Sequence, residues 1–529
     1  MGPTTERGSP VKQAAAVAWG QEGIFDYLQQ VRQPCVVLKD STHKRIGVGP
    51  QSVSGYESIG YLPPLYPEWL GDRSFGEVHG VRFPYASGAM ANGIATTDIV
   101  VAMANAGFLG FFGAAGLSLE RIEAAIDTIE SQTNHGASWG SNLIHNPQEP
   151  HLEAAVADLY IRRGVRRVSA AAYMKLTSSV VRYAYSGIYQ DSAGQIQRKN
   201  YLFAKISRPE VARHFMAPAP EKMLQQLVAD GLLTPEEGKL AAQIPVAEDY
   251  TVESDSGGHT DNQPMNALLP TILDLREQMV AQYSYSRPIR IGAAGGLGTP
   301  QGVAAAFALG AAFVVTGSVN QSCVESGLAV KGKELLAKLT LADVVMAPCA
   351  DMFEMGVEVQ VVKKGSMFGV RSRRLYELYK NYGSLEAIPQ AEKLRLEKEI
   401  LRMSVAEAWE ETKAFWLDRN PKEVERADRD PKHRMALVFR AYIGQSSRWA
   451  ITGDDDRKMD YQIWCGPAMG AFNSWVKGSF LEDPAERSVV QVARNLIEGA
   501  AVVTRAQQLR TFGVPVPAKA FSFIPRRLK

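Results

Sequence analysis

Short apolar runs alternate with amphipathic stretches over residues 80–325, and this pattern predicts repeated strand–helix units. In the clearest unit, an apolar strand begins at position 290 and leads through a glycine-rich turn to Thr299 and Pro300. Threonine is a good N-cap and proline fits the first helical turn, so these residues predict a helix start. A further strand is predicted at 312–315 and another helix at Ser118. Such alternation implies an α/β fold in which helices cover both faces of a parallel sheet.

Two architectures satisfy this pattern: a closed (β/α)8 TIM barrel and an open, doubly wound sheet. Several successive strand–helix turns carry glycine and polar residues. An open sheet gathers its ligand contacts at one switch point, whereas a barrel uses many loops at the carboxyl ends of its strands. The pattern therefore favours the barrel, with its active site at those carboxyl ends.

Changes in composition along the chain divide it into four parts. Residues 1–75 are mixed, include a predicted strand at 35–38, and are interpreted as an N-terminal extension. The barrel is assigned to 76–330. Residues 331–460 are helical and charged, which predicts an inserted or appended helical substrate-binding subdomain, and 461–529 are expected to pack back on the barrel.

Overall composition narrows the class of protein. The 529 residues are 46% hydrophobic and 22% charged, values typical of a globular enzyme and unlike disordered or collagenous chains. The net charge of +2 offers no global attraction to nucleic acid or to an anionic membrane, so we expect neither partner. The oligomeric state stays open, a homodimer included.

Four cysteines lie far apart without a CxxC pair, and the N-terminus has no apolar secretion segment, so we expect a cytoplasmic protein. Residues 99–117 are uncharged and approach the length of a membrane span. Their glycines and Asn105 instead favour a buried helix followed by a buried strand.

Two glycine turns follow neighbouring predicted strands and are the best candidate for binding a phosphate. Gly295 and Gly296 precede a helix start, and Thr316, Gly317 and Ser318 end the next strand. Free backbone amides and a helix dipole attract anions at such places. The alternative is that both are simply tight turns. Neither the dinucleotide fingerprint nor the P-loop pattern is matched.

His259 is the best candidate for proton transfer. It stands between Asp255 and Asp261 in a loop with Gly257 and Gly258, and a carboxylate there could hold the imidazole in one tautomer. The alternative is an ordinary loop histidine. A metal site formed with the two aspartates is disfavoured because no second histidine has ligand spacing, so we expect no metal.

Three further segments carry candidate ligand-binding residues. Gly88, Ala89 and Met90 form a small-residue turn that would let a flat ring approach the backbone. Asn142 and Lys205 lie in or at the ends of apolar strands. A lysine in a strand core needs a negative partner, and facing a barrel mouth it could stabilise an anionic ring; the alternative is an edge-strand lysine that reaches solvent.

Taken together, these motifs resemble a known family: the trans-acting enoyl reductases of polyketide and polyunsaturated fatty acid synthases. These are relatives of nitronate monooxygenase (2-nitropropane dioxygenase) and of FMN-type bacterial enoyl-acyl carrier protein reductase. The resemblance covers most of the chain, and five segments carry it: Gly88–Ile94, Asp255–Asp261, Ala294–Pro300, Thr316–Gln321 and Val345–Arg374. The set in this order is more specific than its Ala-Gly-Gly element alone.

The resemblance implies an FMN-binding barrel that passes a hydride from NADPH to the β-carbon of an enoyl thioester on an acyl carrier protein. It implies that the two glycine turns hold the FMN phosphate and that Ala89 and Met90 back the ring. Asn142 and Lys205 would contact the polar edge of the ring, and Gly88, Asp255, Gly257 and Gly258 would also contact the cofactor. His259 would lie near the reacting centre.

A basic segment next to the helical region suggests where an acidic carrier protein could dock. Its cations are Lys363, Lys364, Arg371, Arg373 and Arg374. A solvated helix face is the alternative.

Three other functions remain open at this point. A nitronate monooxygenase would use a similar flavin barrel but pass electrons to oxygen. A non-catalytic barrel would only bridge synthase subunits, and a flavin-free barrel enzyme would use the same turns to bind a phosphorylated substrate.

Overall fold

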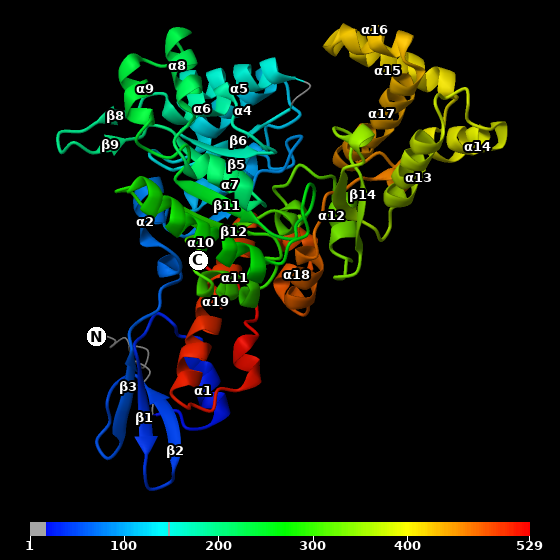
Figure 1. Ribbon diagram of the computed structural model, residues 1–529. Helices are drawn as coiled ribbons and strands as arrows, with labels where there is room; N and C mark the ends of the chain where they lie inside the picture. Colours follow the sequence, from blue (N-terminus) through cyan, green and yellow to red (C-terminus); the bar gives the residue numbers. More distant parts are fainter. Residues whose placement is uncertain (1–16, 147–148) are drawn as a thin grey trace, which may run out of the picture.

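Eight parallel strands form a closed barrel in the computed structural model, which describes residues 17–146 and 149–529 (Figure 1). The strands are β4 (Tyr85–Ser87), β5 (Leu109–Phe112), β6 (Gly140–Ile144), β7 (Arg167–Ala171), β10 (Tyr201–Ile206), β11 (Asp249–Glu253), β12 (Arg290–Ala294) and β13 (Val314–Thr316). Because β13 pairs in parallel with β4, the sheet has no free edge. The predicted (β/α)8 barrel is confirmed, and the open sheet is excluded.

Helices follow the strands and form the outer layer. They are α3 (Thr97–Asn105), α4 (Leu119–Gln132), α5 (Pro150–Arg163), α6 (Ser178–Tyr185), α7 (Pro209–Met216), α10 (Met265–Tyr283) and α11 (Pro300–Ala308). The predicted caps are present, since the side chains of Ser118 and Thr299 accept hydrogen bonds from the amides of Arg121 and Gly302.

Smaller elements decorate this outer layer: α8 (Glu221–Ala229), α9 (Pro235–Ala241) and the hairpin of β8 (Tyr189–Gln190) with β9 (Ile196–Gln197). The uncharged segment 99–117 contributes most of α3 and all of β5, as a buried helix and strand. Among the described residues, every helix is too short or too polar to cross a bilayer.

The eighth helix of the barrel comes late in the chain. α19 (Val489–Thr511) packs against α11 and α3, which closes the helical layer, although residues 317–488 separate it from β13. Most of this insertion lies to one side of the barrel (Figure 1). Its helices are α12 (Val330–Leu336), α13 (Phe368–Asn381), α14 (Gln390–Arg395), α15 (Val405–Arg419), α16 (Pro421–Arg429), α17 (Pro431–Thr452) and α18 (Ala468–Val476).

The insertion has a hydrophobic core of its own, in which Phe353, Leu375, Met435 and Phe439 are fully buried. It also contains an antiparallel hairpin that the sequence pattern did not predict: β14 (Val344–Pro348) and β15 (Glu358–Val362). This hairpin pairs with the barrel loop that follows β11, where Gln360 and Gly258 form an isolated bridge. It therefore links the two cores.

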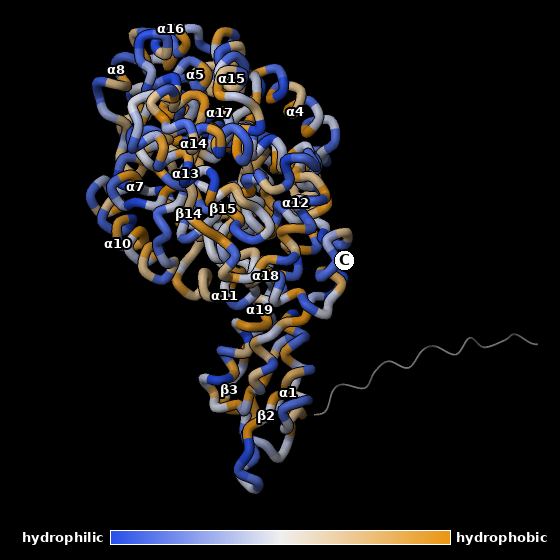
Figure 2. The backbone as a smooth tube through the Cα atoms, turned by 90° about the vertical axis from the view of Figure 1, so that its right-hand side faces the viewer, coloured by the Kyte–Doolittle hydropathy of each residue, from blue (hydrophilic) through white to orange (hydrophobic). Residues whose placement is uncertain are grey.

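The N-terminal part is a small unit of α1 (Gln21–Leu28) and a three-stranded antiparallel sheet. The strands are β1 (Cys35–Asp40), β2 (Arg45–Gly49) and β3 (Glu57–Leu62), and β1, in the centre, contains the predicted strand. Leu28 and Val37 pack with Leu509 at the end of α19, away from the barrel (Figure 2).

The amino end of the barrel is closed by α2 (Arg73–His79). Phe75 stacks on Phe313 with ring centroids 4.4 Å apart. Beside it, Asp249 accepts two hydrogen bonds from Arg290, at 2.6 and 2.8 Å, and lies 3.1 Å from the imidazole Nε2 of His79. All three charged or polar side chains are buried.

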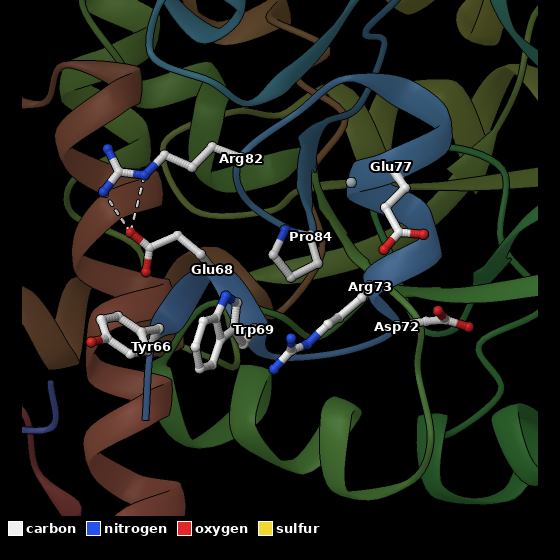
Figure 3. A pocket seen from close by; sticks show the side chains of 9 residues that line it. Tyr66, Glu68, Trp69, Asp72, Arg73, Glu77, Arg82 and Pro84 are labelled. Atoms are coloured by element: carbon white, nitrogen blue, oxygen red, sulfur yellow. Dashed lines mark hydrogen bonds and ion pairs between the residues drawn. The ribbon is translucent and has the colours of Figure 1, made fainter. Parts of the chain in front are cut away.

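A shallow cavity of about 500 Å³ lies at this same end, outside α2 (Figure 3). Arg82 pairs with Glu68 along its wall, and the Arg73 guanidinium stacks over the Trp69 ring. It lies at the opposite end of the strands from every residue predicted for ligand binding, so it does not belong to the predicted site.

Candidate functional site

The two predicted glycine turns lie side by side at the carboxyl end of the barrel. β12 and β13 are neighbours in the sheet, so Gly295 and Gly296 stand next to Gly317 and Ser318. Gly295 and Gly296 both have positive φ, at +85° and +70°, which favours glycine. A Cβ on Gly295 would also come within 2.7 Å of the Ser254 backbone, so only glycine fits there.

Both turns have open space and free backbone amides at the mouth of the barrel. A Cβ added at Gly296 or Gly317 would meet no atom within 4 Å. Among the described residues, no backbone carbonyl accepts a hydrogen bond from the amide of either glycine. Open space lined by unused N–H groups is what a phosphate requires, so these residues fit the phosphate group of a nucleotide-like ligand.

The hydroxyls of Thr316 and Ser318, on either side of Gly317, each have a hydrogen-bond partner within the protein. Thr316 Oγ1 lies 2.6 Å from the hydroxyl of Tyr85, which is buried in the core between the strands and the helices, so this side chain does not face the mouth. Ser318 Oγ accepts a hydrogen bond from the Gly466 amide at 3.0 Å. Ser318 thereby ties the second turn to the segment that follows the insertion's helical core.

A third turn, after β4, adjoins the second. The Gly88 amide donates to the Thr316 carbonyl at 2.8 Å, and a Cβ at Gly88 would press on Val315 at 3.0 Å. Met90 is buried and Ala89 packs against the barrel core. The turn therefore presents a surface of backbone and small side chains beside the candidate phosphate site.

Asn142 and Lys205 lie on barrel strands β6 and β10 and both have partners. Asn142 Oδ1 accepts from the amides of Ala114 and Ala115, at 2.8 and 3.2 Å, which leaves its NH2 hydrogens as the donors it offers a ligand. Lys205 Nζ lies 2.8 Å from Glu253 Oε1. The negative partner that a strand lysine needs is thus supplied by the neighbouring strand β11.

The loop that carries His259 is clamped from two sides. Gly258 and Gln360 exchange backbone hydrogen bonds of 3.0 and 2.8 Å, so β15 holds one side of the loop. Gly257 packs against the other side, because a Cβ there would come within 2.7 Å of the Cys465 amide. Both glycines, predicted to contact a cofactor, are thus explained by close packing and, at Gly258, by a φ of +81°.

His259 has a different carboxylate partner from those predicted. Its Nε2 lies 3.2 Å from Asp351 Oδ2, on the inserted hairpin. Asp261 instead accepts hydrogen bonds from Ser207 and Arg208. Asp255 is part-buried, and that burial raises the pKa of its carboxyl.

The basic segment does not form a bare cationic surface. Arg371 pairs with the buried Asp460, Arg373 lies 3.4 Å from Glu358, and Arg374 pairs with two glutamates. Lys364 lies 3.7 Å from Asp343, and Lys363 is exposed. Because most of this charge is compensated within the chain, the structure gives no support to the predicted docking patch, which stays a prediction.

Comparison with known proteins places the chain and its fold in a family. The model of the nitronate monooxygenase family matches residues 74–366, and that of the inserted helical domain of [acyl-carrier-protein] S-malonyltransferase matches 382–461. The chain therefore belongs to the nitronate monooxygenase family of barrel oxidoreductases, and within it to the branch that contains enoyl reductases. The resemblance seen in the sequence is confirmed.

One solved structure supports that branch directly. The enoyl reductase domain of MlnA, from the macrolactin cluster of Bacillus amyloliquefaciens, is 35% identical with a TM-score of 0.80. The match covers 84% of this chain and 99% of that domain.

Two curated relatives are longer proteins. One polyunsaturated fatty acid synthase polypeptide of Thraustochytrium sp. is 43% identical over 95% of this chain, and the polyketide biosynthesis protein PksE of Bacillus subtilis is 43% identical over 82%. The chain spans about a third of the first protein, 34%, and 56% of the second.

Sequence reasoning missed the residues that cover the site from the insertion. Asp351, Gln360 and Cys465 all contact the loop of His259. The Gln321 side chain donates to the Trp464 carbonyl and so joins the end of β13 to the same segment. Asp351 and Gln360 lie in Val345–Arg374 and Gln321 lies in Thr316–Gln321, segments that carried the family resemblance but did not identify individual contacts. Cys465 lies in neither segment.

Proposed function

We propose that this protein binds FMN and uses NADPH to reduce the α,β double bond of enoyl thioesters, acting in trans on acyl groups held by an acyl carrier protein. The observation that carries the proposal is the pair of open glycine turns beside the clamped His259 loop, in a chain that matches a whole enoyl reductase domain. The relatives, which belong to a polyunsaturated fatty acid synthase and to polyketide biosynthesis, support this class of substrate.

The residues present fit the proposed cofactor. The amides of Gly296 and Gly317 would bind its phosphate, with Gly295 and Ser318 shaping the two turns. The turn Gly88–Met90 would support one face of the ring. The NH2 group of Asn142 and the ammonium of Lys205 would serve as donors to its polar edge. FMN, when bound, supplies a two-electron carrier between NADPH and the thioester.

The chemistry then requires one hydride and one proton. NADPH loses the hydride and becomes NADP⁺; the π bond between the α- and β-carbons is replaced by two C–H bonds, with the proton coming from the medium. Negative charge develops on the thioester oxygen when the β-carbon receives hydride. His259 would either donate a hydrogen bond to that oxygen or deliver the proton to the α-carbon.

The test begins with the purified full chain reconstituted with FMN. We expect an absorbance band of bound flavin, bleaching of this band by NADPH, and recovery on anaerobic addition of a crotonyl thioester. His259→Ala should slow the recovery by about 10²–10⁴-fold, the usual contribution of a positioned acid or base. The saturated product should be detected by mass spectrometry.

Three outcomes would contradict the proposal or part of it. Oxygen uptake that depends on a nitronate and needs no NADPH would identify a nitronate monooxygenase instead. A protein that binds no FMN, yet supports product formation by partner synthase proteins, would identify a structural role. A carrier-linked crotonyl group turned over no better than a small crotonyl thioester would remove the carrier protein from the proposal.

A further inference from the structure

The loop after β14 brings a carboxylate from the insertion to the barrel's candidate catalytic histidine. Asp351 Oδ2 lies 3.2 Å from His259 Nε2, and the ligand atoms of Cys349, Asp351 and His259 all lie within 4.8 Å of one another. The two halves of this contact come from different cores: His259 follows barrel strand β11, and Asp351 follows β14. Folding of the insertion is therefore required to place them together.

Asp351 is held in its ionised form. Partial shielding from solvent would by itself raise the pKa of this carboxyl, but hydrogen bonds and charge from His259, with a further hydrogen bond from Cys349, bring the pKa to about 2. A carboxylate at neutral pH accepts the Nε2–H of an imidazole and so fixes the orientation of the ring; when the ring is protonated, Nδ1–H is the donor left free for a ligand.

The backbone around the contact restricts its geometry. Gly258, directly before the histidine, is joined to β15 by two hydrogen bonds, and β15 pairs with β14, which leads to Asp351. The backbone on both sides of the His259–Asp351 contact is thus attached to the β14–β15 hairpin. Both side chains are nevertheless open to solvent, with exposures of 42% and 51%.

We propose that Asp351 is a positioning residue: it binds Nε2 of His259 and thereby directs Nδ1 toward the bound enoyl thioester. This inference rests on the proposed function. It assigns the insertion a part in the chemistry, because the barrel supplies the histidine while the insertion fixes the orientation of its ring. The same arrangement predicts that the enoyl half of the reaction, and not the NADPH half, depends on Asp351.

A purely structural role is disfavoured by the exposure of the pair. Ion pairs open to water contribute little to stability. Removing the Asp351 charge should therefore leave folding and FMN content almost unchanged, so a large kinetic effect would have to arise at the site.

The experiment measures the two half-reactions separately by stopped-flow absorbance of FMN-loaded protein. In Asp351→Asn, we expect reduction by NADPH to keep its rate within about twofold, and reoxidation by crotonyl thioester to slow by about 10–100-fold, as for other partners that orient a functional histidine. Asp351→Glu retains the carboxylate and should recover part of the lost rate. Circular dichroism and flavin content establish that each variant is folded.

A matched control and a double variant complete the test. Asp455 is an exposed aspartate of the insertion paired with Lys331, and Asp455→Asn should leave both half-reactions at the wild-type rate. If Asp351 acts through His259, Asp351→Asn should add less than about twofold to the effect of His259→Ala, because the two residues form one unit.

The outcomes separate this inference from the function on which it rests. If His259→Ala leaves reoxidation unchanged, the proposed role of His259 is wrong. If His259→Ala slows reoxidation but Asp351→Asn does not, or if the two effects multiply, the positioning role is overturned while the function stands. Equal slowing of both half-reactions by Asp351→Asn in a folded, flavin-loaded protein would also overturn it.

Discussion

The two ends of the barrel use charged and small residues in opposite ways. At the amino end, Asp249, Arg290 and His79 are buried together and covered by α2. At the carboxyl end, Gly296 and Gly317 leave open space with unused amides. A buried charge pair is costly to break, because either partner left alone is an uncompensated buried charge, whereas open N–H donors are free to bind a ligand. The difference separates residues needed for folding from residues available for chemistry.

The largest expected effect is at the amino end. Asp249→Asn would leave the buried Arg290 guanidinium without its charged partner, which costs about 3–5 kcal/mol of unfolding free energy. Urea unfolding followed by circular dichroism measures this loss. Arg162→Gln, which breaks an exposed pair with Asp158, is the control and should cost about 0–1 kcal/mol. A midpoint equal to wild type in Asp249→Asn would show that this network does not stabilise the barrel.

The next effect should appear at the carboxyl end without a change in stability. Gly317→Val adds a side chain where no protein atom lies within 4 Å, so the fold tolerates it while the candidate phosphate site is filled. We expect FMN affinity to fall at least tenfold, about 1.4 kcal/mol, by fluorescence titration. Gly383→Val, at another open glycine in the insertion, should bind FMN normally. An unchanged FMN affinity in Gly317→Val would show that the phosphate does not bind at this turn.

Acid pH should also lower the stability of the fold through His79 at the amino end of the barrel. Burial lowers the pKa of His79, so the folded state holds this imidazole neutral while the unfolded chain takes up a proton near the ordinary histidine pKa of 6.5. Stability attributable to His79 is therefore complete above that pH and falls as the solution is acidified, by at most about 1.4 kcal/mol per pH unit. Unfolding of His79→Gln between about pH 7 and pH 5 should show a shallower pH dependence. An identical slope would exclude His79 as the source.

The smallest effect concerns the link between the turns and the insertion. Ser318→Ala removes the acceptor of the Gly466 amide and should cost about 1 kcal/mol of stability, with a change in FMN affinity below about tenfold. Thermal unfolding with and without FMN separates the two quantities. A loss of FMN affinity as large as that of Gly317→Val would instead make the Ser318 hydroxyl a direct ligand.

Local signals in the sequence were sufficient for the barrel. Thr299 and Ser118 cap helices where predicted because capping depends on neighbouring residues only. The glycine turns were also found, since a turn between a strand and a helix is a local pattern. Their assignment to a phosphate, and that of His259 to proton transfer, stay predictions.

Contacts between distant segments could not be read in the same way. Asp255 and Asp261 are near His259 in the chain, yet its partner is Asp351, because the packing of the insertion decides which carboxylate reaches the loop. The basic segment shows the same limit, because its arginines have acidic partners, such as Asp460, that the local pattern does not reveal. The hairpin β14–β15 was missed because it lies within a region of mainly helical composition.

The late position of α19 in the chain affects when the barrel can finish folding during synthesis. α3 and α11 are complete long before the helix that must cover the groove between them. At about 5–20 residues per second, synthesis of the intervening segment 317–488 takes roughly 10–30 s. During that interval the surfaces of α3 and α11 that pack against α19 have no partner helix, so the helical layer cannot close until α19 is made.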